Sequence, residues 1–445
     1  MTAVDALLPA VDHTPVWGIP DTSRTPLSST MRCGTVVVGA GIAGLSLAYS
    51  LSRLGHGDDI VVIDAGTVGS GASGRGTGLV GPRLGPPLHL ARKRLGDNAT
   101  ATLHRWSERA VEHVVEICAH LDRDCEVTPC TQLVVARDPS SRRTLELEHR
   151  AAQELGLSVP FVAIGDCATT SDYPGLRYTA ATVNPRRYLE ALAQSAERRG
   201  VRIFEQSPVR SVIGTDRVKH VHTDRGGITA DRVILTVNGS SSYPIRRTGV
   251  VGLRVQAAAT APLPPAILAD VQHLRSEPIL EKGTVAAYYR LTRDDRVIVG
   301  GGHVRRGHHG GPAPDLSYLT NALRRLHPKL DTVELTHAWS GPIGMTLDNL
   351  PVVGERPDGI IVAAGWCGHG IAASSYVGAT LAEHLAHRDR DVDRSWSTVF
   401  PLPRAKAREL PRSSIVDRAL DIHLSRISGS EANHRPVPGS SRPVR

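Results

Sequence analysis

Residues 35–64 read TVVVGAGIAGLSLAYSLSRLGHGDDIVVID. A β-branched run, Thr35–Val38, is followed by a glycine-rich turn and then by leucines and alanines at helical spacing as far as Leu54. A second apolar run, Ile60–Ile63, comes next, and Asp64 follows it directly. Strand, helix and strand within about thirty residues predict the βαβ unit of a parallel sheet.

The turn inside this unit has the spacing Gly39-x-Gly41-x-x-Gly44. Gly39 permits the tight turn from strand to helix, Gly41 lets the backbone approach a pyrophosphate, and Gly44 lets the helix pack closely on the strand. Ile42 and Ala43 open the predicted helix, whose first turn offers free N–H groups and a partial positive charge to phosphates. A glycine turn with a purely structural role is the alternative, but the flanking strand and helix favour a dinucleotide-binding site.

A carboxylate stands where such sites bind the adenosine ribose. Asp64 lies twenty residues beyond Gly44, at the end of the second predicted strand. It can accept hydrogen bonds from the ribose hydroxyl groups, and it would repel a 2′-phosphate. The sequence therefore disfavours NADP, and Ala65 beside Asp64 is a further expected contact.

A second glycine-rich segment, GSGASGRGTG, occupies residues 69–78. It contains five glycines, and ordering so many is entropically costly unless something large and flat lies against them. This requirement favours FAD over NAD, while a flexible loop is the alternative. The expected cofactor contacts in the segment are Ser70, Ala72, Ser73, Gly74, Arg75, Gly76 and Thr77.

Residues 64–78 resemble the FAD-dependent amine and amino-acid oxidoreductase superfamily, which includes D-amino-acid oxidase, glycine oxidase and sarcosine oxidase. The run Gly-Ala-Ser-Gly-Arg is most similar to the gamma-glutamylputrescine oxidase branch of that superfamily. Further segments match in the expected order, and the likeness covers residues 15 to 390. These segments are 183–201, 233–239, 288–302, 339–354 and 365–371.

The resemblance implies an α/β plus β fold, with a Rossmann-like FAD-binding domain and an interleaved substrate domain on a mostly antiparallel sheet. The expected FAD-binding domain is discontinuous and comprises residues 33–90, 183–239 and 342–395. The expected substrate domain comprises residues 91–182 and 240–341. Residues 1–32 are expected to form a leader lying over a domain, and residues 396–445 a basic, partly disordered tail.

Further cofactor contacts are carried over from the resemblance. Val209 falls where a backbone amide and carbonyl meet the adenine, and Asn238 and Gly239 end a strand that closes over FAD. A glycine-rich turn then precedes a C-terminal helix, and its N–H groups and helix dipole can stabilise negative charge on the reduced flavin pyrimidine. The turn residues expected in contact are Gly365, Gly368, His369, Gly370 and Ile371. His369 is the titratable side chain there, and both a packing and a catalytic role stay open.

Four positions depart from the family pattern. Some relatives attach FAD through a histidine or a cysteine at the positions of Arg75 and Gly341, so non-covalent FAD is expected here. Sarcosine oxidase has a lysine for the reaction with oxygen where this chain has Ile298. The branch usually has asparagine where this chain has Gly76. An electron acceptor other than oxygen therefore stays open.

The expected activity is oxidation of the C–N bond of an amine or amino acid to an imine, by hydride transfer to the flavin. The resemblance places Tyr288, Tyr289 and Arg290 on the substrate face, and Arg83, Arg254 and Arg290 are candidates to bind a substrate carboxylate. One alternative is a dehydrogenase acting on a secondary amine, an imino acid or a biosynthetic intermediate. A remote alternative is a flavin-binding scaffold without turnover.

Composition excludes several other classes. The 445 residues are 40% hydrophobic and 22% charged, as in globular proteins of two or three domains. The net charge of +8 is not gathered into a basic stripe with aromatic residues, which disfavours nucleic-acid binding. No run of eighteen apolar residues predicts a membrane span, and six cysteines without a Cys-x-x-Cys pair favour reduced thiols in the cytoplasm. A loop with His303, His308 and His309 is better explained as solvated than as a metal site, and no metal is expected.

Overall fold

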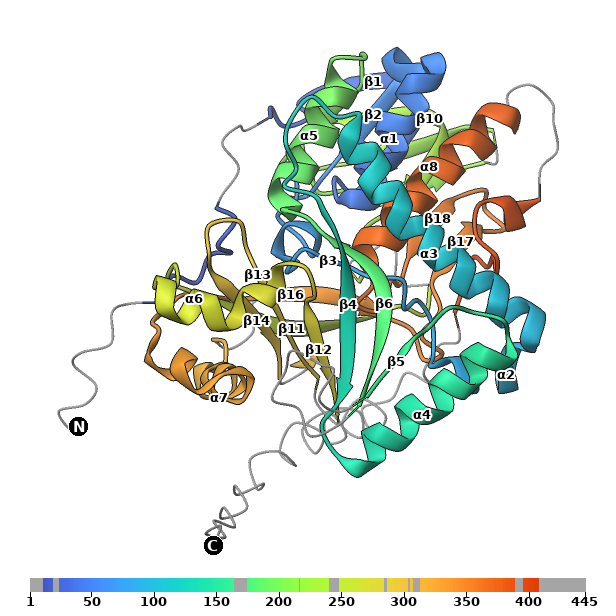
Figure 1. Ribbon diagram of the computed structural model, residues 1–445. Helices are drawn as coiled ribbons and strands as arrows, with labels where there is room; N and C mark the ends of the chain where they lie inside the picture. The colour runs from blue at the N-terminus through green and yellow to red at the C-terminus, as the bar shows by residue number, and fades with distance from the viewer. Residues whose placement is uncertain are drawn as a thin grey trace, which may run out of the picture.

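The computed structural model describes residues 11–18, 24–163, 174–215, 217–239, 248–283, 286–302, 305–306, 313–388 and 395–407. These residues build two β-sheets that are packed with helices (Figure 1). The histidines His303, His308 and His309 and most of the expected basic tail lie outside the described residues.

One sheet is mainly parallel and has the βαβ unit at its centre. Val37 and Val62 belong to the core on one face, and Val36 and Val61 to the core on the other, as in parallel sheets buried on both sides. Strands β18, β10, β1, β2 and β7 run parallel to one another, and the remaining strands are antiparallel to their neighbours. The order along the sheet is β17 (Val352–Glu355), β18 (Ile361–Ala364), β10 (Gly227–Leu235), β1 (Thr30–Val38), β2 (Ile60–Ile63) and β7 (Arg202–Phe204), with β9 (Lys219–His222) on β10 and β8 (Ser211–Gly214) on β9.

Helices cover one face of this sheet. Helix α1 (Ile42–Leu51) packs against α8 (Gly370–Arg388) and α5 (Pro185–Glu197), and α3 (Asp97–Ala119) packs against α8. Nine of the ten residues of α1 are buried, which explains why its sequence is apolar all round. The helix that carries the first glycine turn is therefore fixed by neighbours on several sides.

The other sheet is antiparallel except for the pair β12–β4. Helix α7 (Leu316–Leu326) covers one face, and α4 (Pro139–Glu154) packs on the opposite face near β4 and β6. Helix α2 (Leu88–Leu95) packs on α3 and α4, and α6 (Pro265–Val271) packs on the short helical turn Gln272–Arg275. The strand order is β15 (Arg305–Arg306), β11 (Val251–Thr260), β14 (Val297–Gly301), β13 (Ala287–Leu291), β12 (Ile279–Lys282), β4 (Thr128–Ala136), β6 (Gly175–Thr182) and β3 (Leu79–Val80), with β16 (Leu335–Met345) on β11 and β5 (Phe161–Val162) on β6.

The chain alternates between the two sheets. Strands β1, β2, β7 to β10, β17 and β18 belong to the mainly parallel sheet, and the others to the antiparallel one. The predicted fold class, a Rossmann-like domain with an interleaved antiparallel domain, is confirmed. The exact domain boundaries stay a proposal, and β3 lies inside the range 33–90 although it pairs in the antiparallel sheet.

The N-terminal segment contacts both sheets. The N–H of Asp12 donates to the carbonyl of Thr336, and the carbonyl of Asp12 accepts from the N–H of Ala338, so the segment adds to β16. Further along, Arg24 is nearly buried and pairs with three carboxylates near α5 and β7. These are Glu190, Glu197 and Glu205. The leader expected to lie over one domain therefore joins two.

Two elements of the βαβ unit differ from their predicted bounds. Strand β2 matches Ile60–Ile63, but β1 begins five residues earlier than predicted, at Thr30. Helix α1 ends at Leu51, because the chain makes a wider turn over Ser52–His56, where Gly55 has a φ of +93°. Among the described residues, no helix combines the length and apolar character needed to cross a membrane.

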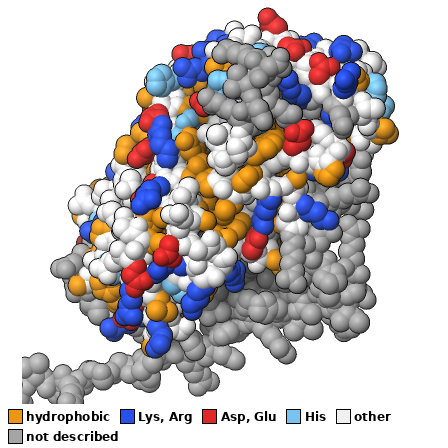
Figure 2. All heavy atoms as spheres, turned by 90° about the vertical axis from the view of Figure 1, so that its right-hand side faces the viewer, with side chains coloured by type: hydrophobic (Ala, Val, Ile, Leu, Met, Phe, Trp, Pro, Cys, Tyr) orange, Lys and Arg blue, Asp and Glu red, His pale blue; other side chains and the backbone are white. Residues whose placement is uncertain are grey.

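Figure 2 shows one face of the molecule, seen from the right-hand side of Figure 1. Apolar side chains gather in its middle, and basic and acidic side chains are interspersed around them. Among the residues coloured in this view, the positive charge does not form a stripe, in agreement with the pattern in the sequence.

Gly44 provides a test of the packing between α1 and β1. A Cβ atom at this position would overlap the carbonyl oxygen of Gly39 and lie 3.0 Å from Cγ1 of Val37. We expect Gly44→Ala to lower the free energy of unfolding by about 2 kcal/mol or more, measured by thermal or urea denaturation. In the control Gly227→Ala, the new Cβ would meet no atom closer than 3.4 Å. Equal stability of both variants would contradict the close packing.

Candidate active site

The first glycine turn lies at the carboxyl end of β1. Gly39 has a φ of +113°, and its N–H donates to the carbonyl of Ile63 at 2.8 Å. A Cβ at Gly41 would lie 2.9 Å from Oγ of Ser73, and the same Oγ accepts the N–H of Ile42 at 3.1 Å. The second glycine-rich segment therefore lies directly over the N-terminus of α1, where the sequence predicts the phosphates.

Asp64 turns back toward this glycine turn. Its Oδ2 accepts the N–H of Ala40 at 2.7 Å, and its Oδ1 accepts the N–H of Gly66 at 2.8 Å. Burial raises the pKa of Asp64 above its usual value, against the effect of these two hydrogen bonds. Each oxygen keeps a further lone pair, so the ribose contact stays a prediction. Ala65 beside it is exposed.

Four consecutive carbonyls of the second glycine-rich segment accept hydrogen bonds from two buried side chains and one half-buried side chain. The indole N–H of Trp339 donates to the carbonyl of Arg75 at 2.9 Å, and that of Trp17 to the carbonyl of Gly76 at 2.8 Å. Nη1 of Arg290 donates to the carbonyls of Thr77 and Gly78 at 3.3 and 3.0 Å. These bonds offset the entropic cost of ordering a glycine-rich segment.

The two positions where some relatives carry covalent FAD lie side by side. A Cβ at Gly341 would lie 2.9 Å from Cβ of Arg75. Arg75 donates to the carbonyls of Ser70 and Ser340, both at 3.1 Å, so its side chain ties the segment to β16. Neither position offers a histidine or cysteine for a covalent link.

The glycine-rich turn that leads into α8, residues 365–371, is called the closing turn below. It lies near the second glycine-rich segment. Oδ1 of Asn238 accepts the N–H of Gly365 at 2.9 Å, which joins the end of β10 to the turn. Cδ1 of Ile371 lies 3.8 Å from the position of a Cβ at Gly76. Gly368 has a φ of +86°, and a Cβ there would meet no atom within 4 Å, so its backbone borders open space.

The remaining predicted contacts fall in or near these turns. Gly239 approaches the backbone of β16, where a Cβ would lie 2.8 Å from the carbonyl oxygen of Ile343. The side chain of Val209 packs on the apolar core of the parallel sheet, and its adenine contact stays a prediction. Gly370 begins α8. The N–H of Gly74 donates to the carbonyl of Gly69 at 3.1 Å and closes the short helical turn that follows Ala72.

Strand β13 does not present its three predicted residues to one side. Tyr289 is fully buried under α7, and its hydroxyl donates to the carbonyl of Ala322 at 3.1 Å. Because strand side chains alternate, Tyr288 and Arg290 lie on the opposite face, which Tyr289 does not line. The prediction for Tyr289 is corrected on this ground. Burial raises the pKa of Tyr288 to about 12, so its hydroxyl stays protonated at neutral pH.

Arg290 anchors the second glycine-rich segment through its hydrogen bonds. Its side chain is 3% exposed, and Nη1 also donates to the carbonyl of Val183 at 2.9 Å. The ring of Trp17 lies 5.5 Å from its guanidinium carbon. These contacts therefore disfavour a role for Arg290 in binding a substrate carboxylate.

Trp17 is the site residue that the sequence analysis missed. It packs with Val16 on a small apolar cluster formed by Ala257, Ala259, Ile298 and Trp339. Ile298, at the position of the oxygen-reactive lysine of sarcosine oxidase, is fully buried in that cluster. The available signal was one tryptophan in a leader otherwise rich in small and polar residues.

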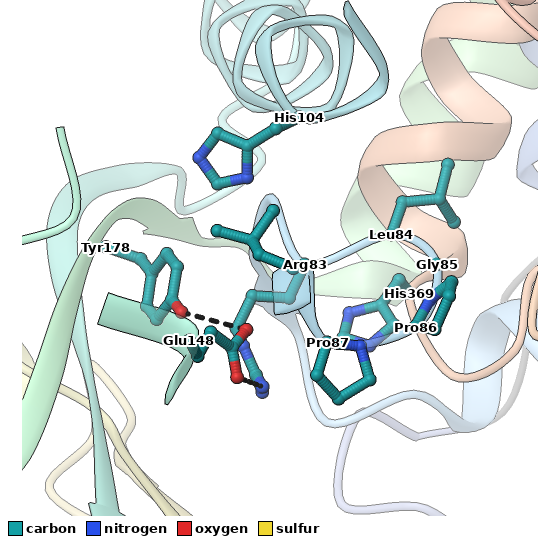
Figure 3. A pocket seen from close by; sticks show the side chains of 10 residues that line it. Arg83, Leu84, Gly85, Pro86, Pro87, His104, Glu148, Tyr178 and His369 are labelled. Atoms are coloured by element: carbon teal, nitrogen blue, oxygen red, sulfur yellow. Dashed lines mark hydrogen bonds and ion pairs between the residues drawn. The ribbon is translucent and has the colours of Figure 1, made fainter. Parts of the chain in front are cut away.

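A pocket adjoins the closing turn (Figure 3). Arg83, Glu148, Tyr178 and His369 line it together with apolar residues between β3 and α2. Burial and then the charge of Arg83 lower the pKa of His369 to about 4, so the imidazole is neutral at pH 7. A neutral imidazole adds no positive charge to this site.

Residues 35–384 match the sequence model of the FAD dependent oxidoreductase family, which also has the name DAO. The chain belongs to this family. Its cofactor is FAD, as the glycine-rich segments and the resemblance predicted, and it is an oxidoreductase, as the resemblance predicted. The predicted superfamily is confirmed.

Relatives of this family member cover most of its length. The probable oxidoreductase OrdL of Rhizobium meliloti is 28% identical over 389 residues, which are 84% of this chain and 88% of that protein. The gamma-glutamylputrescine oxidoreductase of Escherichia coli is 25% identical over 399 residues, 86% of this chain and 91% of that protein. The crystal structure of glycine oxidase from Geobacillus kaustophilus has the same fold, with a TM-score of 0.70 at 18% identity over 86% of this chain and 100% of that one.

The described residues fit FAD. Ser73 of the second glycine-rich segment lies against Gly41 of the first, and Ile371 lies near Gly76. The space beside Gly368 is open. Helix α1 offers its N-terminus to the pyrophosphate, and the closing turn offers N–H groups to the flavin.

Trp17 tests the anchoring of the second glycine-rich segment. Trp17→Phe keeps an aromatic ring but loses the N–H bond to the carbonyl of Gly76, so we expect the dissociation constant of FAD to rise about fivefold. Flavin fluorescence on titrating the apoprotein measures it. Val16→Ala, in the same apolar cluster but without a bond to the segment, is the control. Unchanged affinity in Trp17→Phe would show that the bond does not support the cofactor.

His369 tests the electrostatics of the pocket. Its pKa of about 4 in the folded state lies below the usual 6.5, so the unfolded chain binds more protons between these values. Its contribution to stability is therefore complete above pH 6.5 and is lost as the pH falls toward 4. We expect His369→Gln to reduce the fall in Tm over this range, while His120→Gln, at an exposed position, does not. Parallel curves for His369→Gln and the unmodified protein would contradict this assignment.

Proposed function

We propose that this protein oxidises the C–N bond of an amine or amino acid to an imine, with FAD bound non-covalently. The observation that carries the proposal is that the second glycine-rich segment contacts the first one through Ser73 and lies near Ile371 of the closing turn at Gly76. The printed names of relatives, gamma-glutamylputrescine oxidoreductase and glycine oxidase, support a substrate with a CH–NH group.

The chain's own residues provide binding and orientation. Ser73 and the N-terminus of α1 would hold the pyrophosphate, Asp64 the ribose, and residues 368–371 the flavin pyrimidine. When bound, FAD supplies the hydride acceptor. The dipole of α8 favours negative charge at its N-terminus, and the neutral His369 can exchange a hydrogen bond without adding a charge. Tyr288 remains protonated and provides no base.

A dehydrogenase that uses an acceptor other than oxygen is the second candidate. Ile298 favours it, because this position lies in an apolar cluster covered by Val16 and Trp17. In this version the same C–N oxidation occurs, and the substrate is a secondary amine, an imino acid or a biosynthetic intermediate.

The purified holoprotein tests both candidates. We expect a flavin absorption spectrum, and FAD released into the supernatant after acid precipitation, because neither Arg75 nor Gly341 can form the covalent link. Anaerobic mixing with a panel of amines and amino acids should bleach the flavin with at least one of them. Fast reoxidation by oxygen would exclude the dehydrogenase, and slow reoxidation with fast reduction of an artificial acceptor would support it. Failure of the whole panel to bleach the flavin would count against C–N oxidation.

A further inference from the structure

Residues 399–404, which the sequence analysis assigned to the tail, return to the mainly parallel sheet. Val399 and Phe400 are fully buried and belong to the apolar core that also contains α1 and α8. Arg404 then pairs with the edge strand β17, where its N–H donates to the carbonyl of Val353 at 2.7 Å. These contacts place the Arg404 side chain beside the loop that precedes β17.

The side chain of Arg404 binds this loop, residues 346–351, which leads from β16 to β17. Nη1 and Nη2 donate to the carboxylate of Asp348 at 2.5 and 2.8 Å, in the two-bond geometry that arginine forms with carboxylates. Nε donates to the carbonyl of Pro351 at 2.9 Å, and Nη2 also donates to the carbonyl of Leu350. One side chain thus holds the loop at three of its residues.

The ion pair between Arg404 and Asp348 keeps both charges. Their side chains are 23% and 36% exposed, so water screens the attraction only in part. Burial alone would raise the pKa of Asp348, but the hydrogen bonds and the charge of Arg404 hold that pKa below its usual value. Asp348 is therefore ionised at neutral pH.

Thr346 joins the loop to the closing turn. Its hydroxyl donates to the carbonyl of Leu350 at 2.8 Å, and the same oxygen lies 3.5 Å from Sγ of Cys367. A Cβ at Gly365 would lie 3.0 Å from Cγ2 of Thr346, so the backbone of the closing turn is in close contact with this side chain. The position of the closing turn therefore depends on the position of the loop.

Two residues along this path have backbone conformations that are uncommon outside glycine. Asn349 has a φ of +58°, and Cys367 has a φ of +52°. Such conformations persist where the surrounding contacts leave the chain no alternative. Asn349 lies between two loop residues that accept hydrogen bonds from Arg404. Cys367 donates its N–H to the carbonyl of Gly344 at 2.9 Å and has its thiol beside Thr346.

From these contacts we infer that Arg404 is a positioning residue for the flavin, which acts through Thr346 to fix the N–H groups of the closing turn. The inference rests on the proposed placement of the flavin pyrimidine at residues 368–371. Donors that are already in place stabilise developing negative charge without a cost of reorganisation, so the reduced flavin gains more from them than the oxidised flavin does. Arg404 therefore raises the reduction potential of the bound flavin.

The reduction potential of the holoprotein tests this role. The flavin is reduced with dithionite beside a reference dye, so the measurement needs no substrate. We expect Arg404→Met to lower the two-electron potential by about 30 mV, which is a tenfold loss in the preference of the site for reduced over oxidised FAD. Arg404→Lys keeps a charge beside Asp348 but not the two-bond geometry, and it should restore part of the potential.

Thr346→Val tests the path from the loop to the closing turn. Valine has nearly the same shape but lacks the hydroxyl, so we expect a lower potential although Arg404 is still present. Because both residues act on the same turn, the double variant should lower the potential by clearly less than the sum of the two single changes. Additive changes would overturn the inference. If Arg404→Met retains no FAD, the potential of Thr346→Val decides, and an unchanged value overturns the inference.

Arg109→Met is the matched control. Arg109 forms a two-bond ion pair with Glu116 on the exposed side of α3, at 2.8 and 2.7 Å, and neither residue belongs to the loop or the closing turn. Its loss should leave the potential unchanged, and an equal fall in this variant would count against a specific role for Arg404. FAD content and far-UV circular dichroism monitor folding in every variant.

The outcomes distinguish this inference from the proposed function. If the potential is the same in Arg404→Met, Thr346→Val and the unmodified protein, the positioning role is wrong, while C–N oxidation is still decided by bleaching with amines and amino acids. If the potential falls as expected but no compound of the panel bleaches the flavin, the positioning role stands and the proposed reaction fails.

Discussion

Hydrogen bonds to the carbonyls of residues 75–78 hold the rest of the site in place. Their donors are Trp339 in β16, Trp17 in the N-terminal segment and Arg290 in β13. A segment so rich in glycine has many conformations to lose, and donors from three elements restrict it to one. Because Ser73 of the same segment contacts the N-terminus of α1, this anchoring also sets the position of the phosphate-binding turn relative to the antiparallel sheet.

The sequence was most informative where chemistry and local conformation coincide. The glycine spacing and the exact bounds of β2 followed from residues adjacent in the chain, and so did the close approach at Gly44. The orientation of Tyr289 could have been inferred as well, because the two-residue period of a strand cannot place it beside both Tyr288 and Arg290. The resemblance named the three residues together without regard to this alternation.

Other features could not be read from local patterns. The N-terminal segment has no periodicity that would link Trp17 to Gly76, 59 residues away. Lys282 pairs with the buried Glu148 across 134 residues, and each of these two residues taken singly resembles an ordinary surface charge. Such sites arise from the tertiary arrangement, so neither composition nor spacing indicates them, whereas burial and unpartnered donors mark them in the folded protein.

The position of the N-terminal segment has a consequence for biosynthesis. The backbone partners of Asp12, Thr336 and Ala338, are made more than three hundred residues after it. Pairing over such separations closes slowly, because the intervening chain must first be ordered. This pairing can therefore form only after translation has passed β16.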